Sequence, residues 1–225
     1  MIIAIDGFAG AGKSTTAKFL AQKLGYLYID TGAMYRAITY LAIKNNILDN
    51  TQAVIDSTIK SDLKLIYKDG LTTVILNGQN VTEQIRTFEV NSKVSDISKI
   101  EEVRDDLVKK QQAMGVNGAV VMEGRDITTV VFPNADLKIF LTASIEQRAI
   151  RRLKEIKDKS PEITLEDIKN NLLKRDDIDS HRAVSPLRKA DDAIEIDTSD
   201  ITIEEQVELI YEKARQVAEK KGLSV

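Results

Sequence analysis

The sequence predicts an α/β protein with a parallel sheet, and three consecutive features support this fold class. Residues 2–5 form an unbroken apolar run, as expected of a strand that is covered on both faces. A glycine-rich turn follows, and apolar residues then recur at helical spacing over residues 13–24, before Gly25 ends the helix. A second short strand is expected at residues 26–29. Strand, loop, helix and strand at this spacing indicate a βαβ unit, whose strands are parallel.

The later part of the chain continues the alternation of strands and helices. A helix is expected from residue 30 to about residue 44, and a helical pattern covers residues 87–114. Further buried strands are expected at residues 119–122, 137–141 and 193–196. Capping boxes predict the starts of three more helices, at Ser144/Gln147, Thr164/Asp167 and Thr202/Glu205.

Residues 60–86 interrupt this alternation. Apolar runs at residues 63–67 and 72–76 flank a turn at 68–71, and Asn77-Gly78 is a second turn signal. This pattern predicts an antiparallel hairpin or a three-stranded insert. The charged segment 154–163, which contains Pro161, is expected to be a mobile surface loop.

The composition argues against several kinds of site and partner. The net charge of −3 over 225 residues gives no general excess of positive charge for nucleic acid or anionic lipid. The absence of cysteine excludes disulfides and thiolate metal sites, and the single histidine argues against a zinc site built from histidines. Asp6 interrupts the apolar start too early for a signal peptide, and no apolar run approaches membrane-spanning length. We therefore expect a soluble, cytoplasmic protein with no nucleic-acid or membrane partner.

Residues 7–14, with the sequence Gly-Phe-Ala-Gly-Ala-Gly-Lys-Ser, fit the phosphate-binding loop pattern G-x-x-x-x-G-K-[ST] between a strand and a helix. Backbone N–H groups in such a loop form a hollow for phosphate oxygens, and the following helix adds its positive N-terminus. Lys13 would contact the β- and γ-phosphates, and the Ser14 hydroxyl would bind Mg²⁺. A glycine-rich turn without a ligand is the alternative. The residues expected to surround a nucleoside triphosphate are Gly7, Phe8, Ala9, Gly10, Ala11, Gly12, Lys13, Ser14 and Thr15.

Arginines indicate what the triphosphate would react with, because their planar forks pair with phosphate oxygens two at a time. Several follow strands or lie at helix edges, and three share one face of a helix: Arg36, Arg125, Arg175 and Arg182, with Arg148, Arg151 and Arg152. A solvated surface charge is the alternative for each one alone. The sequence offers no clear proton acceptor, since His181 lies in a polar run. A phosphate acceptor needs none, because its second pKa is near 6. The residues therefore favour a kinase whose acceptor is the phosphate group of a second compound.

Five motifs, taken together, resemble those of bacterial cytidylate kinases over about residues 2–215. They are the loop at 7–14, Asp-Thr-Gly-Ala-Met-Tyr-Arg at 30–36, Ile-Arg-Thr at 85–87, Glu-Gly-Arg-Asp at 123–126 with Thr-Val-Val-Phe-Pro at 129–133, and Arg-Asp-Asp at 175–177 with Arg-Ala-Val-Ser-Pro at 182–186. The loop alone would indicate only a P-loop protein, whereas the last two motifs are far more specific.

The resemblance implies a nucleoside monophosphate kinase fold with a five-stranded parallel core, a β insert in the monophosphate-binding region and a lid. It implies one unit over residues 1–225, with its core in 1–60, 87–147 and 180–225, the insert at 60–86 and the lid at 148–179. The implied reaction transfers a phosphoryl group from ATP to CMP or dCMP with Mg²⁺, in an enzyme that we expect to be a monomer.

The resemblance also implies roles for individual residues. Thr31, Arg36, Arg125, Arg175 and Arg182 would surround the acceptor phosphate, Ser95, Arg104 and Asp126 the cytosine, and Asp179 with Arg175 the sugar. Arg148, Arg151 and Arg152 would close with the lid, and these three, with Lys13, Arg125 and Arg182, would act on the moving phosphoryl group. Glu123 would hold a Mg²⁺-bound water. The chemistry suits this assignment, because the Asp126 carboxylate complements the cytosine amino group and Arg104 complements its acceptors.

Some positions depart from the commonest family pattern, Thr128 among them, and two other functions stay open. Thr128 stands where the family usually has glycine, and it would be strained if that position required a positive φ. Another small P-loop kinase, acting on UMP, a broader set of pyrimidine monophosphates or a non-nucleotide phosphate, is one alternative. An ATP-binding module without turnover is the other.

Overall fold

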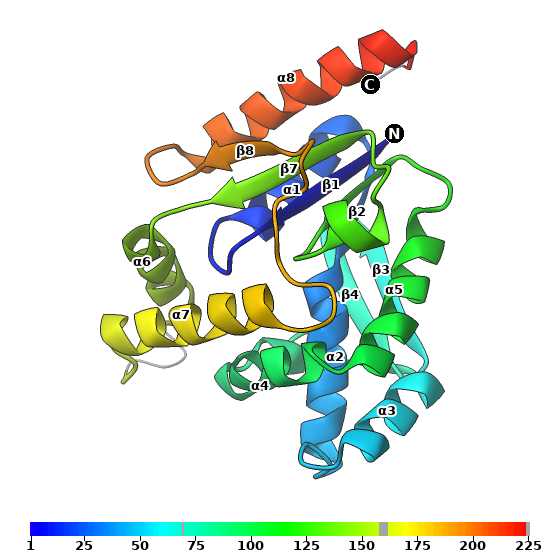
Figure 1. Ribbon diagram of the computed structural model, residues 1–225, viewed down its shortest axis with the longest axis vertical. Coiled ribbons are helices and arrows are strands. Elements are labelled where there is room, and N and C mark those ends of the chain that lie inside the picture. Colours follow the sequence, from blue (N-terminus) through cyan, green and yellow to red (C-terminus); the bar gives the residue numbers. More distant parts are fainter. Residues whose placement is uncertain (69, 158–161, 224–225) are drawn as a thin grey trace.

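The main sheet of the computed structural model is parallel, as the sequence predicts. The structure describes residues 1–68, 70–157 and 162–223. Within them the strand order is β2-β6-β1-β7-β8, and every neighbouring pair is parallel. The strands are β1 (Ile2–Gly7), β2 (Leu27–Asp30), β6 (Val120–Glu123), β7 (Leu137–Thr142) and β8 (Ile194–Asp197). Because β1 lies at the centre, the loop that follows it emerges between the loops after β6 and β7 (Figure 1).

Helices cover both faces of this sheet. On one face Ile3 and Ile5 of β1 pack with residues of α1 (Lys13–Leu24) and α8 (Ile203–Lys221). On the other face Ala4 packs with Val120 and Met122 of β6 and with the short π-helix η2 (Ile127–Val131). The unbroken apolar character of β1 follows from this double coverage.

The remaining helices build the lower part of the molecule in Figure 1 and the layer beside the loop after β1. They are α2 (Thr31–Lys44), α3 (Thr51–Lys60), α4 (Phe88–Ser98), α5 (Glu101–Gly115), α6 (Ile145–Ile156) and α7 (Leu165–His181). Asp30 caps α2 by accepting a hydrogen bond from the Ala33 N–H, and the capping boxes predicted at Thr164 and Thr202 are both formed. α6 and α7 pack together around Ala149, Ile168 and Leu172.

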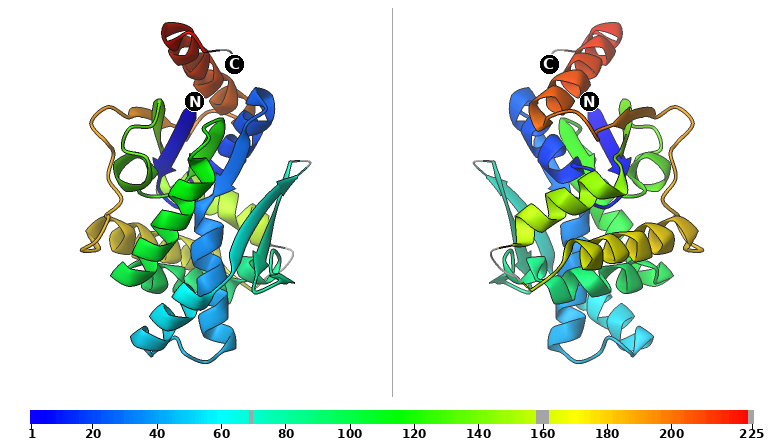
Figure 2. Two further views of the ribbon diagram at one scale, coloured as in Figure 1. Left: turned by 90° about the vertical axis from the view of Figure 1, so that its right-hand side faces the viewer. Right: turned by 90° about the vertical axis from the view of Figure 1, so that its left-hand side faces the viewer.

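The predicted insert is a small antiparallel sheet of β3 (Leu63–Lys68), β4 (Leu71–Leu76) and β5 (Gln79–Asn80). Its inner side chains pack against α2 in the largest apolar cluster around Ile38. Figure 2 shows the β3–β4 hairpin standing beside the main sheet and separate from it.

Three details of the predicted helices are corrected by the structure. The stretch 87–114 is two helices, because Ile100 is extended (φ −73°, ψ 119°) and starts α5 in a new direction. This break puts the Ser98 carbonyl within reach of the Arg104 side chain, 2.9 Å away. At Ser144 only half of the capping box is present: its hydroxyl accepts from the Gln147 N–H. The helix α3 has no counterpart among the elements expected from the sequence.

The segment expected to act as a lid, 148–179, consists mainly of residues of α6 and α7. Part of the expected mobile loop, residues 158–161, lies outside the described residues. No helix within the described ranges is both long and apolar enough to cross a membrane.

Candidate active site

The loop between β1 and α1 depends on glycine at two points. Gly7 has a φ of +145°, and a Cβ there would lie 2.0 Å from the carbonyl oxygen of Leu141 in β7. Gly12, the N-cap of α1, has a φ of +91°, in the left-handed region that favours glycine. The loop thereby delivers the free N–H groups of the α1 N-terminus, which attract anions. Lys13 is 4% exposed and its Nζ donates to the Phe8 carbonyl at 2.7 Å, so its charge lies at this loop.

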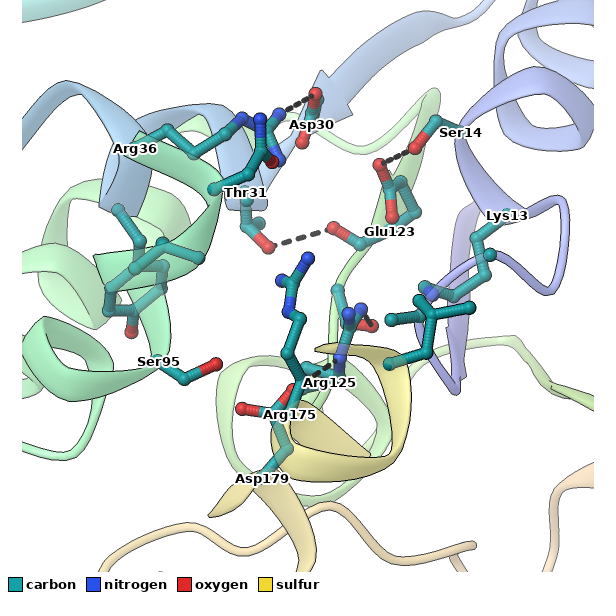
Figure 3. Close-up of a pocket in the computed structure, with 18 of the residues that line it drawn as sticks. Lys13, Ser14, Asp30, Thr31, Arg36, Ser95, Glu123, Arg125, Arg175 and Asp179 are labelled. Carbon is teal, nitrogen blue, oxygen red and sulfur yellow. Dashed lines mark hydrogen bonds and ion pairs between the residues drawn. The ribbon is translucent and has the colours of Figure 1, made fainter. Parts of the chain in front are cut away.

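A cavity of about 410 Å³ extends from this loop towards α4 and α5. It brings together residues from the loop, the α2 N-terminus, the loop after β6, and the helices α4 to α7. Figure 3 shows Arg125 and Arg175 between Lys13 on one side and Ser95 on the other. The residues expected from the sequence that line the cavity are Ala9, Gly10, Gly12, Lys13, Ser14, Thr15, Thr31, Arg36, Ser95, Arg104, Glu123, Arg125, Asp126, Arg151, Arg152, Arg175, Asp179 and Arg182.

The other four expected residues, Gly7, Phe8, Ala11 and Arg148, do not line the cavity. Phe8 packs edge to face on Phe140 of β7 with ring centroids 5.8 Å apart. Arg148 lies behind the loop: it donates to the Ala9 carbonyl at 3.0 Å and pairs with Asp176 of α7. Arg148 therefore joins α6 and α7 to the loop backbone, whereas Arg151 and Arg152 of the same helix face the cavity.

Ser14 and Glu123 form an oxygen pair at the loop end of the cavity. The Ser14 hydroxyl donates to Glu123 Oε1 at 2.7 Å, and Glu123 is 4% exposed. Burial, and then the neighbouring Asp30, raise the pKa of Glu123 to about 7. Burial, and then the Arg125 charge, lower the pKa of Lys13 to about 7. Burial thus disfavours the charged form of both side chains.

A hydroxyl and a carboxylate are donors that suit Mg²⁺, which takes few protein ligands and keeps waters and phosphate oxygens. Within the described ranges there is no group of three or more His, Cys, Asp or Glu residues placed to hold a metal by themselves. The donor set present therefore fits a cation that arrives with a phosphate compound.

The middle of the cavity concentrates positive charge. Arg125 Nε donates to Asp179 Oδ2 at 2.9 Å, and Arg36 pairs with Asp30 at 2.7 Å. Burial, and then the like charge of Arg125, lower the pKa of Arg175 to about 10. The Nε atoms of Arg36 and Arg175 are buried and have no hydrogen-bond partner within the described part of the chain. These guanidinium groups retain donors for the oxygens of an anion.

The far end of the cavity is built on a buried ion pair between Arg104 and Asp126. Arg104 is 1% exposed, donates to the Ser98 carbonyl, and lies over the Tyr35 ring at 5.3 Å from its centroid. Arg182 NH2 lies 4.0 Å from Asp126 Oδ1. The Ser95 hydroxyl is buried without a hydrogen-bond partner in the described ranges. A flat polar group that enters this end of the cavity would meet the Arg104 and Ser95 donors beside the Asp126 carboxylate acceptor.

Thr128 is not strained, so the concern raised by its position in the motif does not apply. Its φ is not positive, in contrast to Asn46, Asn77, Ala119 and Ser185. Its N–H and its hydroxyl both donate to Asp6 at 2.7 Å.

Asp6, Asp30 and Tyr35 were not expected to have a role, although all three contact the elements of the site. For Asp6 the sequence does hold a signal, a charged residue at the end of an apolar strand directly before the glycine-rich loop.

Comparisons with known proteins assign the chain to a family. The family model for cytidylate kinase matches residues 3–216. The chain is 50% identical over 221 residues to a cytidylate kinase of Flavobacterium johnsoniae, covering 96% of each chain. It is 50% identical over 216 residues to a cytidylate kinase of Bacillus subtilis, covering 95% of this chain and 96% of that one. An uncharacterized protein from Eubacterium ventriosum, 12% identical, shares the fold with a TM-score of 0.53 over 96% of this chain and 98% of that chain. On this evidence, together with the motifs and the cavity that joins them, the chain belongs to the cytidylate kinase family.

Proposed function

We propose that the protein transfers the γ-phosphoryl group of ATP to CMP or dCMP, giving ADP and CDP or dCDP. The observation that carries this proposal is one continuous cavity with a phosphate-binding loop at one end and the Arg104–Asp126 pair at the other. Membership of the cytidylate kinase family supports the same reaction.

At the loop end, backbone N–H groups and Lys13 bind the triphosphate. Ser14 would hold Mg²⁺ directly and Glu123 through a water, where the ion would neutralise charge on the phosphates. Because the Ser14 hydroxyl donates its hydrogen to Glu123, its lone pairs would remain available to the metal.

In the middle of the cavity, Thr31, Arg36, Arg125, Arg175 and Arg182 would hold the acceptor phosphate, and Asp179 with Arg175 the sugar. The acceptor oxygen is already ionised at neutral pH, so no residue has to remove a proton. His181 is consistent with this, since its side chain is 77% exposed on α7. Residues 148–179 would act as the lid, with Arg151 and Arg152 closing on the phosphates and excluding water. Residues 60–86 would be the insert of the monophosphate-binding region.

At the far end, Asp126 would accept a hydrogen bond from the cytosine amino group while Arg104 donates to the base acceptors. Uracil has a carbonyl in place of that amino group, so it would leave two acceptors facing each other, at a cost of about 1–3 kcal/mol.

Replacing Asp126 with asparagine should therefore lower the ratio of kcat/KM for CMP to that for UMP by about ten- to a hundredfold, because an amide can donate to the uracil carbonyl. The ratio is measured by coupled assay with each monophosphate. Asp177→Asn is the matched control, because it removes the same charge from a side chain that is 74% exposed on α7. An unchanged ratio in Asp126→Asn would contradict the role given to Asp126.

ATP binding should take up a proton at about pH 8. In the free protein burial lowers the pKa of Lys13 to about 7, and the triphosphate, being anionic, favours the charged form and raises that pKa again. Affinity for ATP should consequently weaken as the pH rises above about 7. Calorimetry without metal, in two buffers of different ionisation enthalpy, measures the proton taken up, and Lys13→Met should remove the part of the uptake that Lys13 contributes. Equal apparent enthalpies for the wild type in both buffers would contradict this assignment.

Incubation with ATP and Mg²⁺ plus CMP, dCMP, UMP, AMP or GMP in turn tests the function itself. We expect CDP and dCDP with CMP and dCMP as acceptors, and much slower turnover of UMP. Preferential phosphorylation of UMP or of a non-nucleotide phosphate would favour another small kinase, and ATP binding without any product would favour a binding module. We further propose that the protein is a monomer. The absence of cysteine suits a reducing compartment such as the cytoplasm.

A further inference from the structure

The loop after β6 leads into η2, and the first N–H groups of any helix have no partner inside it. Asp126 is the N-cap residue of η2, the position where an aspartate carboxylate usually accepts from those N–H groups. Here the Asp126 side chain makes no such hydrogen bond. Its carboxylate is turned instead into the cavity, where it pairs with Arg104.

The cap is provided by a different strand. Asp6, at the end of β1 and fully buried, accepts from the Ile127 N–H through Oδ1 at 3.0 Å and from the Thr128 N–H through Oδ2 at 2.7 Å. It lies 121 residues away from Ile127 in the chain. The two first N–H groups of η2 are thus satisfied from outside, and Asp126 is not needed for them.

Thr128 adds a third donor, since its hydroxyl also donates to Asp6 Oδ2 at 2.7 Å. Burial raises the pKa of Asp6 to about 6 against the opposing effect of the Thr128 hydrogen bonds, so the carboxylate is ionised at about pH 8 and can only accept. The neighbouring hydroxyl of Thr129, by contrast, has no hydrogen-bond partner in the described ranges.

We propose that Asp6, held by Thr128, is a positioning residue for acceptor selection: it caps η2 from β1 and so leaves the Asp126 carboxylate available to the acceptor base. This inference rests on the proposed function, in which Asp126 contacts cytosine. Without the Asp6 cap, the N–H groups of Ile127 and Thr128 would lack a hydrogen-bond acceptor. They would then compete with Arg104 and the base for the Asp126 carboxylate. A purely structural role for Asp6 would lower stability but would leave the preference for CMP over UMP unchanged.

The first test removes one donor from the cap at a distance from the phosphate-binding loop. Thr128→Ala should raise KM for CMP by about tenfold, with KM for ATP and kcat little changed. Thr128→Ser, which keeps the hydroxyl, should restore KM for CMP. Thr129→Ala is the matched control, because it removes from the next residue a hydroxyl that has no hydrogen-bond partner among the described residues. The proposal is overturned if Thr128→Ala and Thr129→Ala have the same KM for CMP, or if Thr128→Ser does not restore it.

The second test asks whether Asp6 acts through Asp126. An asparagine at position 6 can still accept from one N–H but presents its own N–H₂ to the other, so the CMP-to-UMP ratio of kcat/KM should fall by about tenfold in Asp6→Asn. In an Asp126→Asn background, Asp6→Asn should lower the ratio no further, because the Asp126 carboxylate that Asp6 keeps available is already absent. Equal effects of Asp6→Asn in both backgrounds would overturn the proposal, as would an unchanged ratio in the single variant.

Two further outcomes separate this inference from the proposed function. If Asp126→Asn alone keeps the wild-type preference for CMP, the proposed contact between Asp126 and cytosine fails whatever Asp6 does. If Asp6→Asn does not fold, the Thr128 series decides the inference by itself.

Discussion

Replacing Lys13 with alanine should lower kcat by about a hundredfold to a thousandfold, the usual effect of removing one group that stabilises charge in the transition state. Lys13 is buried with its Nζ at the loop carbonyl of Phe8, so no other cation of the loop can take its place. The free protein should stay folded, because burial of this charge is unfavourable, as its lowered pKa indicates. Steady-state kinetics with saturating CMP and a thermal melt measure both effects.

The matched control for this change is Lys23→Ala, which removes the same charge from the exposed end of α1 and should leave kcat near that of the wild type. A Lys13→Ala variant with near-native kcat would contradict the role given to Lys13 and with it the placement of the triphosphate.

Replacing Arg182 with alanine should lower kcat/KM for CMP by about a hundredfold or more, because its guanidinium would serve two parts of the proposed acceptor site. Arg182 lies 4.0 Å from Asp126 and 3.8 Å from Asp179, and its Nε is fixed by the Ser185 carbonyl at 2.7 Å. Its NH2 group is buried without a hydrogen-bond partner in the described part of the chain, which leaves it available to a ligand.

Arg182→Lys separates charge from geometry. Lysine keeps the charge but loses the planar fork, so it should recover only part of the lost activity. Arg188→Ala, an exposed arginine further along the same segment, should have no comparable effect. Full activity in Arg182→Lys would show that the planar guanidinium of Arg182 is not required. Full activity in Arg182→Ala would contradict any role of Arg182 in binding the acceptor.

The parts of the fold that could be predicted are those coded within a few residues. The run of β1, glycine-rich loop and α1 is specified by adjacent apolar residues and glycines, and the structure confirms it. The hairpin of β3 and β4 is specified by its turn and by the apolar runs on either side of it. The break between α4 and α5 could not be predicted in this way, because no glycine or proline marks Lys99 or Ile100. That break depends on tertiary packing.

The same distinction applies to the site. Most cavity-lining residues lie in short motifs, which explains why the sequence identified them. Arg148 shows the limit of the pattern, because its spacing from Arg151 and Arg152 is helical, yet it points to the Ala9 carbonyl instead of the cavity. Asp6 was missed because its partners, Ile127 and Thr128, are far away in the chain and lie beside it only after β1 and β6 pair.

The hydrogen bond from Arg148 to Ala9 has a mechanical consequence. The Cβ of Arg148 also lies so near Gly10 that a side chain at position 10 would approach it to 3.1 Å. A movement of α6 would therefore either break this hydrogen bond or displace the Ala9–Gly10 peptide together with the helix. Movement of α6 and the shape of the phosphate-binding loop would in this way be coupled. Binding of a triphosphate to the loop would then change the position that α6 prefers.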